Sequence, residues 1–268
     1  MTELLEPYAV YAIKYAHHER TSRENFLFSD PHDTLMPMDY FVWAIVGNGR
    51  TVVVDTGFDE QQAQARGRQL LRSPAAGLDL LDIDCAHVNE VVLTHLHYDH
   101  CGTTAEFPAA RFHLQDREMA FATGRHMSHG TVRHAFSVDS VVDLVRAVYD
   151  ERVNFVRGEL ELHPGISLHH VGGHTDGLQI VRVWTQRGWL VLASDATHYY
   201  ANMERPNPFP IVFHVGDMLE GFRTLLALSD GPENIIPGHD PLVMRRYPAP
   251  SRELEGIVAR VDLAPILD

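Results

Sequence analysis

Cysteine and long apolar runs are what this sequence has least of. Cys85 and Cys101 are its only cysteines among 268 residues, which excludes a disulfide framework, and Cys101 is expected to be a small buried residue. No apolar stretch reaches the length that spans a membrane, and the acidic first residues lack the basic and apolar regions of a signal peptide. We therefore predict a cytoplasmic protein without a membrane partner.

Basic residues are also scarce. The chain carries 22 Lys and Arg against 36 Asp and Glu, a formal net charge of −14. Its longest basic run is the pair Arg245-Arg246, whereas nucleic-acid phosphates demand clustered Lys and Arg, so no nucleic-acid partner is expected. A hydrophobic content of 45% supports a substantial core, and no Pro/Gly/Ser-rich linker or charge block divides the chain. We predict one domain over residues 1–268.

Histidine, by contrast, is abundant, with 18 residues. Four metal-competent side chains lie within six positions: His95, His97, Asp99 and His100. A strand predicted at residues 88–94 leads into them. Side chains two apart on an extended segment point the same way, so His95 and His97 can hold one ion. Asp99 and His100 leave the strand in another direction and can hold a second. A solvated histidine-rich loop is the alternative interpretation.

Three later segments predicted as strands each end in a metal-competent residue beside a glycine or small residue: His174, Asp195 and His239. Taken singly, a histidine at a strand end is more often a core residue. Together with the cluster at 95–100, however, they supply seven side chains, about the number that two neighbouring ions need if one carboxylate bridges them. Asp55 also ends a predicted strand. It is either a turn former or the acceptor for a ligand histidine's free N–H, and we favour the second role.

Elsewhere the chain reads as hairpins separated by single helices. Further strands are expected at residues 8–15, 41–46, 51–55 and 153–162, and helices at 59–71, 140–149, 216–228 and 251–260. In the helix at 140–149, helical spacing predicts one buried face made of Val141, Val142, Val145, Val148 and Tyr149. The pattern predicts an α+β fold of two packed sheets with helices on the outer faces.

The order of these motifs resembles the metallo-β-lactamase fold superfamily. His95-x-His97-x-Asp99-His100 is followed by Gly173-His174, Ser194-Asp195 and Gly238-His239, and Asp55-Thr56-Gly57 fits the superfamily's first motif. The resemblance covers nearly the whole chain and implies a four-layer αββα sandwich with two metal ions at one edge. It assigns His95, His97 and His174 to one ion, Asp99, His100 and His239 to the other, and Asp195 as the bridge.

Within the superfamily the chain looks most like the N-acyl homoserine lactonase group, in length and in the segments around Asp195 and His239. The resemblance implies a hydrolase in which a hydroxide bridging two divalent ions attacks a lactone carbonyl, with Asp99 donating a proton to the alkoxide. Those lactonases usually carry a tyrosine three residues after the bridging aspartate, where this chain has His198. We expect His198 or Tyr199 to donate a hydrogen bond to the carbonyl oxygen. The ligand set suits Zn²⁺, and Mn²⁺, Fe²⁺ or Co²⁺ could occupy it.

The expected partner is a small lactone, bound in a pocket whose candidate residues are Met36, Met38, Tyr40, Phe41, Met127, Phe209 and Phe213. A Gly/His/Met-rich stretch at 124–134 is a candidate rim. Two alternatives are a glyoxalase II-like thioesterase, which shares these ligands, and, in a different class, a mononuclear iron dioxygenase that oxidises sulfur. The thioesterases usually carry basic residues for glutathione, and none stands out near the motifs. The sequence leaves open the natural lactone, the native metal and whether the chain forms a homodimer.

Overall fold

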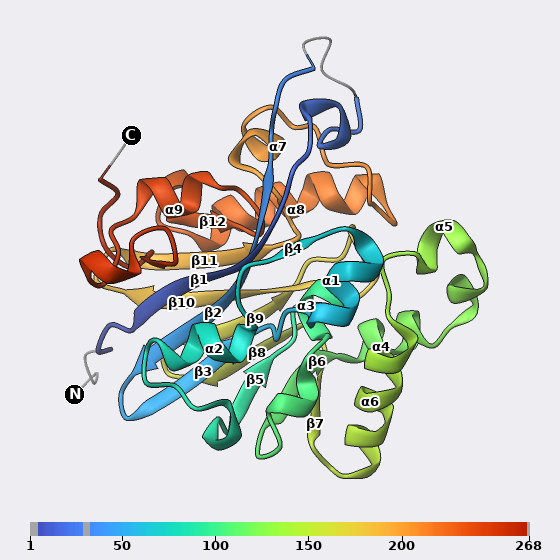
Figure 1. Ribbon diagram of the computed structural model, residues 1–268, viewed down its shortest axis with the longest axis horizontal. Helices are drawn as coiled ribbons and strands as arrows, with labels where there is room; N and C mark the ends of the chain where they lie inside the picture. The colour runs from blue at the N-terminus through green and yellow to red at the C-terminus, as the bar shows by residue number, and fades with distance from the viewer. Residues whose placement is uncertain (1–4, 29–32, 267–268) are drawn as a thin grey trace.

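Two β-sheets packed face to face form the centre of the molecule, as the computed structural model shows (Figure 1). The structure describes residues 5–28 and 33–266. The first sheet has the order β13 (Val258–Arg260), β1 (Ala9–His18), β2 (Met38–Gly47), β3 (Arg50–Val54), β5 (Glu90–Val92), β6 (Arg111–Gln115) and β7 (Val153–Val156), with β4 (Gln69–Leu70) pairing β1. The second has the order β12 (Ile235–Pro237), β11 (Gly188–Ser194), β10 (Gln179–Thr185), β9 (Ile166–His170) and β8 (Glu159–His163).

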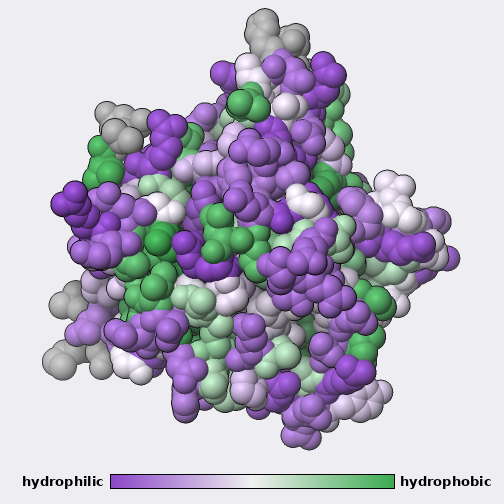
Figure 2. All heavy atoms as spheres, in the orientation of Figure 1, coloured by the Kyte–Doolittle hydropathy of each residue, from purple (hydrophilic) through white to green (hydrophobic). Residues whose placement is uncertain are grey.

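Helices form the outer layers of the sandwich and the loops at its edge. They are α1 (Glu60–Arg66), α2 (Pro74–Asp79), α3 (Tyr98–Cys101), α4 (Asp116–Ala122), α5 (Gly130–Arg133), α6 (Val138–Tyr149), α7 (Tyr200–Glu204), α8 (Val215–Leu228) and α9 (Leu242–Arg246). No helix in the described part of the chain is long and apolar enough to cross a membrane. Hydrophilic residues cover most of the molecular face shown in Figure 2.

Alternation of side chains along each strand produces the layers. On β2, Trp43 and its alternate neighbours face the second sheet and pack with residues such as Leu168 and Leu190. The opposite face of β2 joins a separate core that includes Leu144 of α6. On the far side of the sandwich, Phe222 of α8 packs in a third cluster with residues of β10 and β11. These four layers confirm the predicted αββα architecture.

Several predicted boundaries are wrong. The helix expected at 251–260 is instead a short 3₁₀ turn (Arg252–Leu254) followed by β13, which pairs antiparallel with β1. Burial of Val258 and Ala259 at the edge of the sheet outweighs the helical propensity of the segment. The single strand expected at 153–162 is two strands, β7 and β8, in different sheets.

Two predicted helices also differ in detail. The helix expected at 59–71 ends at Arg66, because Gly67 adopts a left-handed conformation with φ 64°. In α6 the buried face consists of Ser140, Val141, Leu144 and Ala147. Tyr149, which was expected on that face, is 87% exposed. The predicted face is therefore rotated from the buried one, which includes Leu144 and the small residues Ser140 and Ala147.

Candidate metal centre

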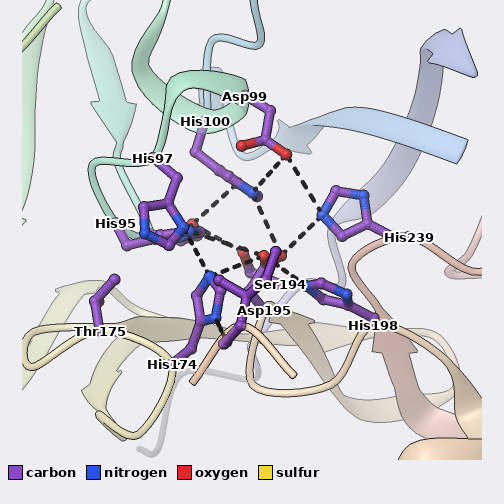
Figure 3. Close-up of polar contacts among 12 residues, drawn as sticks. His95, His97, Asp99, His100, His174, Thr175, Ser194, Asp195, His198 and His239 are labelled. Atoms are coloured by element: carbon purple, nitrogen blue, oxygen red, sulfur yellow. Dashed lines mark hydrogen bonds and ion pairs between the residues drawn. The ribbon is translucent and has the colours of Figure 1, made fainter. Parts of the chain in front are cut away.

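The strand ends of both sheets meet at one edge of the sandwich, and the seven predicted ligands lie there together (Figure 3). His95 and His97 lie in the loop after β5, and Asp99 and His100 lie in α3. The loops after β9, β11 and β12 carry His174, Asp195 and His239. Their ligand atoms form two sets, each with all its atoms within 4.8 Å of one another: His95, His97, His174 and Asp195 in one, and Asp99, His100 and His239 in the other.

Asp195 lies between the two sets and turns one oxygen to each. Its Oδ2 is 3.2 Å from His174 Nε2 and 3.8 Å from His95 Nε2. Its Oδ1 is 3.3 Å from His100 Nε2 and 3.0 Å from His239 Nε2. The same two nitrogens lie 3.8 and 3.9 Å from Asp99 Oδ2. This is the arrangement that a carboxylate shared by two cations requires.

The hydrogen bonds of the outer ring nitrogens show which nitrogen of His174 and of His239 is free. His174 Nδ1 donates to the carbonyl oxygen of Ile211 at 2.6 Å, and His239 Nδ1 donates to that of Asp39 at 2.9 Å. Because a carbonyl oxygen can only accept, Nδ1 carries the proton in both rings. Nε2 of His239 faces Asp195, and Nε2 of His174 faces both Asp195 and His97 Nδ1, the latter at 2.8 Å.

Buried atoms without partners show that the site suits a cation. The Nε2 atoms of His95, His100 and His239 and Oδ1 of Asp195 are buried and make no hydrogen bond to another described residue. Such atoms are costly to bury unless something else satisfies them. Burial, with His100 nearby, holds the pKa of His95 well below its usual value, so this imidazole is neutral as a ligand must be. Imidazole and carboxylate donors of this kind bind divalent metal ions.

Asp55 stands behind the second set. It is fully buried, and its Oδ2 accepts from His100 Nδ1 at 2.7 Å. Its two oxygens also accept from the backbone N–H of Thr94 at 2.7 Å and from the Thr94 hydroxyl at 2.8 Å. The carboxylate therefore orients His100, in the geometry expected of an acceptor for a ligand histidine.

Glu118 performs a similar task behind the first set, although no sequence motif marks it. This fully buried carboxylate accepts from the N–H of Leu96 at 2.9 Å, from the hydroxyl of Thr175 at 2.6 Å and from the N–H of Gly177 at 3.0 Å. It thereby joins the loop of His95 and His97 to the loop of His174. An acidic residue in a short helix offers no local pattern that distinguishes it from a solvated one.

The two predicted hydrogen-bond donors lie in different surroundings. His198 is buried, its Nε2 is 2.9 Å from Asp195 Oδ2, and its ring stacks on Phe209 with centroids 3.3 Å apart. The hydroxyl of Tyr199 instead donates to the backbone carbonyl oxygens of Pro37 at 3.3 Å and Met36 at 3.5 Å. His198 is therefore in contact with the cluster, and Tyr199 holds the segment before β2.

Two cavities meet at the cluster. The larger, about 370 Å³, is mostly apolar and is lined by Phe121, Val132, Phe136, Ile211 and Phe213 beside His97 and His174. The smaller, about 60 Å³, lies over Asp99 and Asp195 and is lined by Arg20, Arg66, Arg68, Met38 and Tyr40 among others. Thr131, Val132 and His134, from the stretch proposed as a rim, line one or both.

The predicted pocket residues divide accordingly. Met38 and Tyr40 line the smaller cavity, Phe213 lines the larger one, and Phe209 packs on His198. Phe41 is a correction: adjacent side chains on a strand face opposite sides, so it points into the core between the sheets. Met36 and Met127 also line neither cavity; Met36 borders a separate pocket behind Tyr199, and Met127 packs against the core of the first sheet.

The arginines are a second correction, because no basic residue was expected near the motifs. Arg20 follows β1, and Arg66 and Arg68 lie at the end of α1 and just before β4. Antiparallel pairing of β4 with the end of β1 brings these separate segments together. The three arginines lie together because of this tertiary pairing, and no sequence motif connects them.

Comparison with known families agrees with this geometry. The model of the Metallo-beta-lactamase superfamily matches residues 36–239, and the chain belongs to that superfamily. A curated relative is the N-acyl homoserine lactonase AiiB of Rhizobium rhizogenes, 31% identical over 218 residues that span 71% of this chain and 75% of the relative. The resemblance drawn from the motifs is therefore confirmed.

Solved structures share the fold. An N-acyl homoserine lactone hydrolase with the product N-hexanoyl-L-homoserine bound at its catalytic metal centre superposes with a TM-score of 0.72 at 19% identity, over 87% of this chain and 94% of that one. AidC, a dizinc quorum-quenching lactonase, gives a TM-score of 0.65 at 14% identity, over 86% of each chain.

Proposed function

We propose that this chain is a metal-dependent hydrolase that opens the ring ester of lactones, with N-acyl homoserine lactones as the first substrate class to test. The observation that carries the proposal is the division of Asp195 between two sets of histidine nitrogens, Oδ2 facing one and Oδ1 the other. The named activity of the 31% identical relative supports the choice of lactones.

We assign one divalent ion to His95, His97 and His174 and a second to Asp99, His100 and His239, with Asp195 shared by both. Zn²⁺ fits this imidazole and carboxylate set, and Mn²⁺, Fe²⁺ and Co²⁺ suit it as well. When bound, such ions lower the pKa of water and polarise an ester carbonyl, which makes hydrolysis possible at neutral pH.

The side chains of the site handle the proton and the position of the substrate. Asp99 is the most exposed member of the second set, with 12% of its side chain accessible, and it lines the smaller cavity. We assign to it the proton released by the attacking water. Ring opening breaks the bond between the acyl carbon and the ring oxygen, and Asp99 then returns the proton to that oxygen as it leaves.

His198 is assigned a positioning role at the carbonyl side of the ring. Its Nε2 faces Asp195 Oδ2, and stacking on Phe209 holds the ring orientation. The buried Nδ1 makes no hydrogen bond to a described residue. The acyl chain of the substrate would occupy the cavity of about 370 Å³, whose phenylalanines and aliphatic side chains suit it.

The test combines elemental analysis of the purified protein with an acid-release assay over N-hexanoyl and N-decanoyl homoserine lactone. We expect about two divalent ions per chain and proton release that stops when the ions are removed by a chelator. A panel of acylated thiols, followed by thiol release, serves as the comparison. Turnover of the thioesters without turnover of the lactones would contradict the proposal.

A further inference from the structure

Three arginines surround the smaller cavity of a chain whose net charge is −14. Arg20, Arg66 and Arg68 line a space of about 60 Å³, and the carboxylates that share this lining are Asp99 and Asp195. Both of those belong to the proposed metal ligands, so bound cations would neutralise them. The local charge of the cavity is therefore opposite in sign to that of the chain.

The three guanidinium groups differ in how much of their hydrogen-bonding capacity the protein uses. Arg66 donates from all three nitrogens, to Gln62 Oε1, His134 O and Phe136 O, so its role is structural. Arg68 donates from Nε to the hydroxyl of Tyr98 and from Nη1 to His18 Nε2 and the Arg66 carbonyl. Its Nη2 makes no hydrogen bond within the described residues.

Arg20 also keeps donor capacity. Its Nη2 donates to the carbonyl oxygen of Glu24 at 2.7 Å, and its Nη1 contacts only the sulfur of Met38, a weak acceptor, at 3.7 Å. The half-exposed carboxylate of Glu24 lies 4.0 Å from Nε. Arg68 has no carboxylate within ion-pair distance in the described chain. Burial and the charge of Arg68 lower the pKa of its neighbour His18 to about 4, so His18 is a neutral acceptor for Arg68.

We infer that the preferred lactone carries an anionic substituent, a carboxylate, which Arg68 and Arg20 bind in the smaller cavity while the ring lies over the metal ligands. This inference rests on the proposed lactonase function and specifies its substrate class. A planar guanidinium recognises a carboxylate by charge-assisted and bidentate hydrogen bonds. The cavity of about 60 Å³ has room for a small group only, and the apolar part of a substrate would extend into the larger cavity.

The experiment compares two lactones that differ in one group: 5-oxotetrahydrofuran-2-carboxylate and its carboxamide. For the unmodified enzyme loaded with Zn²⁺ we expect kcat/KM to be about 10- to 100-fold higher for the carboxylate, the range of a charge-assisted hydrogen bond. Arg68→Gln should remove most of this ratio, because only the charged substituent gains a charge-assisted hydrogen bond from the guanidinium group. Arg68→Lys should retain part of the ratio.

Arg20→Gln provides a second test that does not disturb the contacts of Arg68 with Tyr98 and His18, and it should also lower the ratio. Arg223→Gln, on the outer surface of α8 with 79% of its side chain exposed, is the matched control and should leave the ratio unchanged.

Equal kcat/KM for the two lactones in the unmodified enzyme would overturn the inference, as would an equal loss for both lactones in folded Arg68→Gln and Arg20→Gln. If the enzyme opens N-hexanoyl homoserine lactone in these cases, the lactonase proposal survives and only the substrate preference is refuted. No turnover of any lactone would refute both.

Discussion

Replacing Asp55 by Asn tests how the protein orients a proposed metal ligand, His100, and leaves the proposed ligand set unchanged. The backbone of Asp55 has φ 62°, a conformation that asparagine adopts readily, so the change isolates the charge. The carboxylate accepts three hydrogen bonds, from His100 Nδ1, the Thr94 hydroxyl and the Thr94 N–H. An amide presents only one acceptor oxygen, so at least one of these donors would face an N–H₂ group.

The size of the effect follows from this count. Loss of one hydrogen bond to a buried charged group costs about 1.5–3 kcal/mol of unfolding free energy. Without its carboxylate partner, His100 is no longer fixed in the tautomer that frees Nε2, and loss of such a partner lowers metal affinity about 10- to 100-fold. Asp55→Ala should be worse: it breaks all three contacts, and a left-handed conformation costs about 1–2 kcal/mol more for alanine.

Two measurements check this prediction: urea unfolding of the metal-free protein, and Zn²⁺ titration in competition with a chromogenic chelator. Asp82→Asn is the matched control, because Asp82 also has a positive φ, 57°, but is exposed. Asp55→Asn should lose affinity for one of two ions, whereas Asp82→Asn should match the unmodified protein. If both variants bound Zn²⁺ equally tightly, the proposed orienting role of Asp55 would be refuted.

Three further predictions concern the proton, the first ligand set and pH. Asp99→Asn should lower kcat about 10²- to 10⁴-fold; full activity with both ions still bound would rule out its proton transfer. Glu118→Gln weakens the bonds that join two ligand loops, so urea unfolding should show a loss of about 1.5–3 kcal/mol, and an unchanged midpoint would contradict this. Burial, with Arg68, lowers the pKa of His18 to about 4. The unfolded chain therefore takes up a proton first as pH falls from 6.5 toward 4, and stability is lost in that window by about 1–2 kcal/mol after solvent screening. His18→Asn should show a smaller loss between pH 7 and 4.5.

The strands of this fold were largely predictable because their signal is local. Residues 41–46 and 51–55 with a Gly-Asn-Gly turn indicated a hairpin, and β2 and β3 form it. The last strand was missed because β13 has three residues and owes its conformation to pairing with β1. A segment of three residues contains no pattern that would predict its pairing with β1, so the local sequence favoured a helix.

Residues outside the ligand motifs were less predictable, for a related reason. Tyr40 and Phe41 look alike in sequence, yet one lines a cavity and the other lies between the sheets. Which face of a strand borders the site depends on the register of the sheet and not on the residue. Glu118 and the three arginines likewise reach the site through tertiary contacts alone.

The proposed ligand motifs, in contrast, could be predicted from the sequence, because the backbone conformation restricts the residue before each ligand. Gly173 has φ 87° immediately before His174, and Ser194 has φ 45° immediately before Asp195. In each case a left-handed residue directly before the ligand turns the chain, so that the ligand side chain points into the edge of the sandwich. Gly238 serves a different need before His239, since a Cβ there would lie 2.7 Å from the backbone of Ser194 and 2.8 Å from Asp195 Oδ1. The backbone therefore requires a small residue directly before each of these three proposed ligands. Because the small residue and the ligand are adjacent in the chain, the pair can be recognised in the sequence.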